Sequence, residues 1–142
     1  MAEPAWLTWA KTKIGVHEIP GPGDNPEIVS WFHFTSLDRA DWHDATAWCS
    51  VFVNAAFGLN GGKGTGSAAA ISWAKWGHEV EYDEALPGDV VVFEWDSGQH
   101  HVAFFEKQDE DRVKVLGGNQ GAAGEVSEAW HSKDYVLNVR RA

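Results

Sequence analysis

The first half of the chain carries apolar residues at helical spacing. Residues 4–14 place an apolar side chain at every third or fourth position, which predicts a helix ending near Gly15. A second helix is expected to begin at Pro26, with Asn25 as its cap and apolar side chains on its buried face. Ser67 is predicted to cap a further helix that reaches Trp76.

A different pattern, an unbroken apolar run, occupies residues 47–57. Its length and its lack of alternation predict a buried helix. Asp44 or Thr46 can cap the start of this helix, which would place Cys49 in its first turn.

The second half of the chain changes to a period of two, which is typical of strands. Turn sequences such as Pro87-Gly88-Asp89 separate the alternating segments. Strands are predicted at Val90–Trp95, His101–Glu106, Arg112–Leu116 and Tyr135–Val139. Helices followed by an antiparallel meander predict an α+β fold class, with no linker or repeat to divide residues 1–142 into more than one domain.

Composition narrows the classes of partner. The formal charge of −10, without a basic cluster, argues against nucleic acid and against an anionic membrane surface. The chain has 44% apolar residues and nine tryptophans, most of which we expect in the core. A single cysteine excludes an internal disulfide. We therefore expect a monomer that holds its substrate by shape and hydrogen bonding.

The amino-terminal segment has neither the basic region nor the long apolar region of a secretory signal. No stretch approaches the roughly 20 apolar residues that a membrane span needs. We expect synthesis in a host cytoplasm, with action in the periplasm or cell wall only after release by another agent.

Three residues at the ends of predicted elements can supply the groups of a cysteine hydrolase. Cys49 begins a helix, whose dipole and free N–H groups favour a thiolate and can bind an oxyanion. His101 begins a strand and can act as general base and acid. Asn119 follows the next strand, where an amide can orient the imidazole. Taken singly, each residue is weak evidence, since a lone cysteine is more often a core residue, and it is the joint placement of the three that favours catalysis.

Four segments together resemble CHAP domains (cysteine, histidine-dependent amidohydrolases/peptidases), the papain-like peptidoglycan hydrolases of phage endolysins and bacterial autolysins. The residues from Pro4 to Glu18 further resemble a compact phage and prophage subgroup. The four segments are Ala47-Trp48-Cys49-Ser50, Pro87-Gly88-Asp89-Val90-Val91-Val92-Phe93, His101-Val102-Ala103-Phe104-Phe105 and Leu116-Gly117-Gly118-Asn119-Gln120.

The resemblance implies a papain-like fold with Cys49 as nucleophile, His101 as base and acid, and Asn119 as the orienting residue. It favours His101 over His100, because His101 directly precedes the Val-Ala pair. We expect the neighbouring residues Trp48, His100 and Gln120 to contact the substrate. The chain departs from the family in having Gly117 where many members have an acidic residue, and in lacking a glutamine upstream of the cysteine.

The implied function is an endolysin-like peptidoglycan hydrolase without cofactor or metal. It would act as an N-acetylmuramoyl-L-alanine amidase or as a stem-peptide endopeptidase. Two alternatives are a non-enzymatic cell-wall-binding or phage structural module, and a secreted antibacterial amidase effector. Zinc or calcium chemistry ranks lower, because neither the histidine nor the aspartate spacing matches a known metal-site pattern. A glycosidase pair, Glu94 with Glu106, also ranks lower, because both residues lie in predicted strands that have better explanations.

Overall fold

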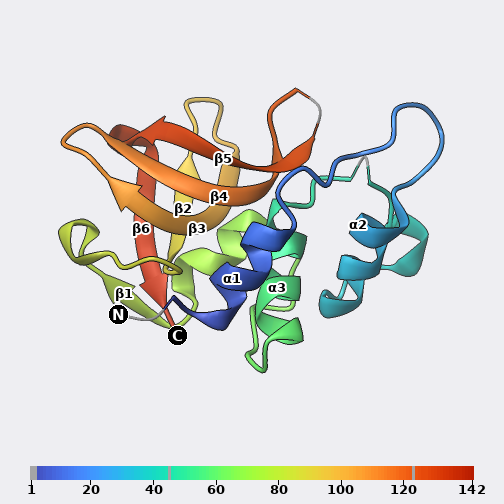
Figure 1. The fold of residues 1–142 in the computed structure, drawn as a ribbon, viewed down its shortest axis with the longest axis horizontal. Helices are drawn as coiled ribbons and strands as arrows, with labels where there is room; N and C mark the ends of the chain where they lie inside the picture. Colours follow the sequence, from blue (N-terminus) through green and yellow to red (C-terminus); the bar gives the residue numbers. More distant parts are fainter. Residues whose placement is uncertain (1–2, 45, 123) are drawn as a thin grey trace.

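Three α-helices pack beside a six-stranded antiparallel sheet in the computed structural model (Figure 1). The structure describes residues 3–44, 46–122 and 124–142. The amino-terminal segment, which lacks the features of a secretory signal, begins with two residues that lie outside the described part of the chain. Within these residues no helix combines the length and the hydrophobicity that crossing a bilayer requires. The helices are α1 (Ala5–Thr12), α2 (Pro26–Trp31) and α3 (Cys49–Leu59); the strands are β1 (His78–Val80), β2 (Val90–Glu94), β3 (His100–Gln108), β4 (Arg112–Gln120), β5 (Glu125–Ser132) and β6 (Val136–Arg141).

The sheet order is β1-β6-β2-β3-β4-β5, which confirms the α+β class and extends the predicted meander. Strands β2 to β5 follow one another, whereas β6 returns across the sheet to pair with β2. The sequence did not predict β1 or β5. β5 is an edge strand with Val126 as its one buried residue, so it lacks the hydrophobic alternation by which strands are recognised.

The two faces of the sheet carry separate hydrophobic clusters. Val102 and Phe104 of β3 pack with α1, α2 and α3 in the larger cluster. Ala103 and Phe105, which alternate with them, belong to the smaller cluster on the other face. His101 contacts Phe93 of the smaller cluster, with 6.0 Å between ring centroids, so its side chain lies on the face away from the helices.

The structure confirms the first two predicted helices. It also confirms Asn25 as the cap of the second, because its side chain accepts a hydrogen bond from the backbone N–H of Glu27. The third begins at Cys49, and neither Asp44 nor Thr46 caps it. Asp44 is buried and accepts from the N–H groups of Ile19 and Asn25 instead, so its carboxylate fixes the preceding loop.

The predicted helix from Ser67 to Trp76 is a 3₁₀-helix, Ala70–Lys75. Trp73 and Trp76 both pack on Phe57, with 5.7 and 5.0 Å between ring centroids. Side chains three residues apart lie on one line in a 3₁₀-helix, so this packing favours the tighter winding.

A pair of glutamates on β3 and β5, the strands on either side of β4, makes stability depend on pH. Burial, followed by the hydrogen bond and the charge of Glu128, raises the pKa of Glu106 to about 7. Lys114 lies between them, 3.5 Å from the Glu128 carboxylate. A carboxyl with a raised pKa binds its proton more tightly in the folded state, so its contribution is largest below the unfolded pKa and is lost as pH rises through 7.

We therefore expect Glu106→Gln to gain stability relative to the wild type between pH 6 and pH 8. The gain is expected to be about 1 kcal/mol, because the group is only partly buried and water screens it. Thermal unfolding at the two pH values measures it, with the exposed Glu110→Gln as the control. A Glu106→Gln difference that does not change with pH would contradict the raised pKa.

Candidate active site

Cys49 is the first residue of α3 and is almost fully buried. Burial raises the pKa of its thiol, and the backbone N–H groups of Val102, Ser50 and Cys49 itself partly oppose this rise. The resting thiol is therefore protonated, in contrast to the thiolate that the helix dipole was expected to favour. The N-cap residue Trp48 makes no side-chain capping bond, so its side chain leaves the first N–H groups of the helix free.

His101 is buried on β3 and is held by a chain of hydrogen bonds. Its Nε2 lies 2.8 Å from Oε1 of Gln120, and Gln120 donates from Nε2 to the carbonyl oxygen of Ser127 at 2.6 Å. Because the amide nitrogen of Gln120 is used by a carbonyl, its oxygen faces the imidazole, and Nε2 of His101 must carry the proton. Burial lowers the pKa of His101, with partial opposition from Gln120. The ring is therefore neutral, with Nδ1 as its basic nitrogen.

Asn119 was predicted to orient His101, but the structure gives that contact to Gln120. The register between β4 and β5 explains the difference, because Gly117 lies opposite Ser127 and Gln120 lies opposite Glu125. One extra residue on β4 inverts the faces beyond the bulge, so Gln120 takes the side that Asn119 would have in a regular strand. Asn119 has φ +57°, a left-handed conformation that asparagine tolerates better than most residues.

The predicted substrate contacts of Trp48, His100 and Gln120 stay predictions, and the structure gives the position of each residue. Trp48 has no exposed surface, and its indole N–H donates to Glu18 at 2.9 Å, so its side chain belongs to the core. His100 lies opposite Glu94 on β2, 3.8 Å from its carboxylate, and alternation places it on the face opposite to His101. Gln120 is also buried and meets His101 rather than solvent.

The Cys49 thiol contacts the backbone of β3 beside His101. The thiol contacts the N–H of Val102, the residue directly after His101. The pairing of β3 with β4 begins at Phe104 and Leu116, which leaves the preceding part of β3 unpaired on that side. In the part of the chain that the structure describes, no hydrogen bond joins the Cys49 sulfur to the His101 ring.

An aromatic cluster surrounds His101 on the face away from the helices. Trp95 and His131 lie 6.1 and 6.2 Å from it between ring centroids. Burial and the neighbouring His101 lower the pKa of His131, whose Nε2 is buried without a hydrogen-bond partner among the described residues. Sequence reasoning did not find this cluster, because its members come from three strands and include the unpredicted β5.

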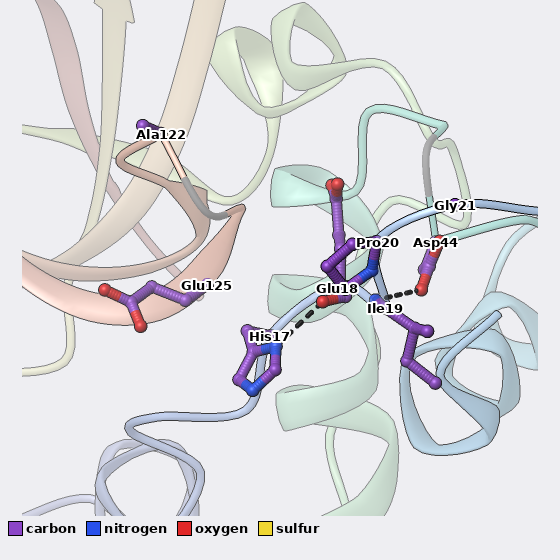
Figure 2. A pocket seen from close by; sticks show the side chains of 8 residues that line it. All are labelled: His17, Glu18, Ile19, Pro20, Gly21, Asp44, Ala122 and Glu125. Carbon is purple, nitrogen blue, oxygen red and sulfur yellow. Dashed lines mark hydrogen bonds between the residues drawn. The ribbon is translucent and has the colours of Figure 1, made fainter. Parts of the chain in front are cut away.

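A cavity of about 510 Å³ lies between the segment 17–21, the loop that carries Asp44 and the turn that joins β4 to β5. Figure 2 shows the segment from His17 to Gly21 crossing between the β-strands and the segment that carries Asp44. No group of three or more histidine, cysteine, aspartate or glutamate residues is placed to hold a metal ion in residues 3–44, 46–122 and 124–142. The lining consists of His17, Glu18, Ile19, Pro20, Gly21, Asp44, Ala122 and Glu125.

Comparisons with known proteins concern the family and the fold of the chain. The CHAP domain profile matches residues 38–119, which contain Cys49 and His101. A solved structure described as similar to a lipoprotein of the NLP/P60 family, from Staphylococcus aureus subsp. aureus Mu50, has a TM-score of 0.59 at 16% identity. That match covers 96% of this chain, which spans 40% of the other chain's length, and it confirms the predicted papain-like fold. No curated protein matches the chain.

Proposed function

Because the chain belongs to the CHAP domain family, whose members are generally cysteine-dependent hydrolases of the amidase and peptidase class, we propose that it hydrolyses an amide bond of bacterial peptidoglycan. The observation that carries the proposal is the hydrogen-bond chain from Ser127 through Gln120 to His101. This chain fixes the tautomer that leaves Nδ1 free to accept a proton, which is what a general base needs.

The first step is attack by Cys49. Nδ1 is the ring nitrogen nearer to the backbone of His101, and the thiol contacts the next N–H along that backbone. Nδ1 of His101 accepts the thiol proton as Sγ forms a bond to the scissile carbonyl carbon. Both groups are neutral at rest, so proton transfer accompanies attack and no preformed ion pair is required.

The carbonyl oxygen becomes an oxyanion in this step, and the uncapped start of α3 supports its stabilisation. The backbone N–H of Cys49, at this uncapped start, is one donor that can bind the oxyanion. The C–N bond then breaks, and the imidazolium of His101 gives its proton to the departing amine. Water, activated by the same histidine, hydrolyses the thioester and releases a carboxylate.

The resemblance to compact phage and prophage proteins supports an endolysin-like role, with action in the periplasm or wall after release from the cytoplasm. The bond attacked is the muramoyl–L-alanine amide or an amide within the stem peptide. The acidic charge of the chain favours a substrate recognised by shape and hydrogen bonds rather than by its own negative charge.

The products of digestion test the proposal. Purified peptidoglycan is incubated with the protein, and the new termini are identified by chemical labelling and mass spectrometry, with peptidoglycan alone as the blank. New amino groups with matching carboxylates are expected, and a chelator is expected to leave their release unchanged. New reducing sugars without amino groups would reject amide hydrolysis and favour a glycosidase.

Replacing Gln120 is expected to impair hydrolysis far more than replacing Asn119. Gln120→Ala removes the acceptor that holds Nε2 of His101, so we expect a fall of about a hundredfold. Asn119→Gly keeps the left-handed backbone and is expected to stay within about twofold of the wild type. Initial rates on peptidoglycan measure both variants, and a larger loss in Asn119→Gly would return the orienting role to Asn119.

A further inference from the structure

Glu18 makes a contact that the proposed mechanism does not use. Its Oε1 accepts a hydrogen bond of 2.9 Å from the indole N–H of Trp48. Trp48 is completely buried, so this carboxylate is the partner that its N–H has in the core. Trp48 is also the residue directly before Cys49 and the N-cap of α3, so a shift of its indole would be transmitted to the nucleophile.

The same indole also fixes β4 at its bulge. A Cβ atom on Gly118 would lie 2.5 Å from the Trp48 ring, so only glycine permits the strand to pass this closely. Gly118 is two residues before Gln120, the partner of His101. Trp48 therefore lies between the start of the nucleophile helix and the strand that orients the histidine.

The segment around Glu18 is anchored on both sides of this contact. The N–H of Glu18 donates to the carbonyl oxygen of Gly124 at 3.0 Å, in the turn that follows Gln120. The next residue, Ile19, donates its N–H to Asp44 at 2.7 Å, in the segment that leads into α3. Figure 2 shows Glu18 between these two parts of the chain. The segment of Glu18 is thus held both by the turn after the strand that carries Gln120 and by the loop that leads into the helix of Cys49. The mechanism needs the distance between this strand and this helix to stay constant.

We propose that Glu18 is a positioning residue, which holds Trp48 so that Cys49 and the His101–Gln120 pair keep their mutual geometry. This role rests on the proposed cysteine mechanism. It requires the oxygen of Glu18 as an acceptor and does not require its negative charge. Glu125 provides a comparison, because its carboxylate lines the same cavity without a side-chain hydrogen bond among the described residues.

The test compares Glu18→Ala, which removes the acceptor, with Glu18→Gln, which keeps an acceptor oxygen without the charge. Glu125→Ala and Glu125→Gln are the matched controls for charge in the cavity. Two rates are measured for each protein: hydrolysis of peptidoglycan, and alkylation of Cys49 by iodoacetamide as a function of pH. Since Cys49 is the sole cysteine, alkylation reports on the environment of its thiol whether or not the protein hydrolyses peptidoglycan.

Glu18→Ala is expected to lose about tenfold or more of the hydrolysis rate and to shift the pH profile of alkylation. Glu18→Gln and both Glu125 variants are expected to stay within about twofold of the wild type in both measurements. Equal losses in Glu18→Ala and Glu18→Gln would overturn the proposal in favour of charge. Unchanged rates and an unchanged profile in Glu18→Ala would overturn it in favour of a purely structural contact.

Trp48→Phe keeps the test decisive if Glu18→Ala does not fold. Phenylalanine has no indole N–H, so in that background Glu18→Ala is expected to have no further effect on either rate. A further loss in the double variant would show that Glu18 acts independently of Trp48 and would overturn the proposal. A wild type without hydrolysis would reject the proposed function, whereas the alkylation profiles would still decide the role of Glu18.

Discussion

Cys49→Ala is expected to reduce peptidoglycan hydrolysis to the level of the blank. The change removes the only thiol of the chain, and Trp95 and His131, the aromatic side chains beside His101, are not comparable nucleophiles. Loss of a nucleophile leaves only binding and oxyanion stabilisation, so we expect a fall of at least about a thousandfold. The release of amino groups from peptidoglycan measures it.

The fold provides the control for this variant. Cys49 is a small buried residue at the first position of α3, and alanine is a better helix former that fits the same space. Circular dichroism and thermal unfolding are therefore expected to resemble those of the wild type. Hydrolysis that persists in a folded Cys49→Ala protein would reject the nucleophile.

His101→Ala is expected to lose about a thousandfold of the hydrolysis rate, whereas His100→Ala is expected to lose about twofold at most. The two histidines are neighbours on β3 and are identical in chemistry, but they occupy opposite faces of the sheet. Only His101 is bonded to Gln120 and precedes the N–H that contacts the thiol. Initial rates on the same peptidoglycan compare the two variants.

The pH dependence of the wild type gives a second measurement for His101. Burial lowers its pKa below the ordinary value of 6.5, so the neutral base persists as the solution becomes acidic. The acid limb of the rate profile is therefore expected below pH 6.5. An equal loss in the two histidine variants, or an acid limb above pH 6.5, would contradict the assignment of the base.

Much of the fold follows from local patterns in the sequence. The cap at Asn25, the apolar run that becomes α3 and the alternation of β2 and β3 each match the structure. β5 was missed, because an edge strand with one buried residue has no alternation to detect. The return of β6 to pair with β2 depends on contacts distant in sequence, which local periodicity does not encode.

The candidate site could likewise be predicted only where local sequence patterns place its residues. Cys49 and His101 were found from their places at the starts of a helix and a strand, and their catalytic roles remain predictions. The bulge in β4 could not be located from the sequence, so the choice between Asn119 and Gln120 required the register with β5. The Gly117-Gly118 pair was the available signal, since glycines within a strand often mark a bulge.

Stoichiometric modification of Cys49 tests the central claim, that its thiol is the attacking group, most directly. Iodoacetamide is added in steps, intact mass spectrometry gives the fraction of modified protein, and the rate of amino-group release is measured on each sample. Because the chain has a single cysteine, each added carboxamidomethyl group on a thiol is on Cys49. We predict that the residual rate equals the unmodified fraction and reaches the blank at full modification. A fully modified protein that still releases amino groups from peptidoglycan would contradict the mechanism.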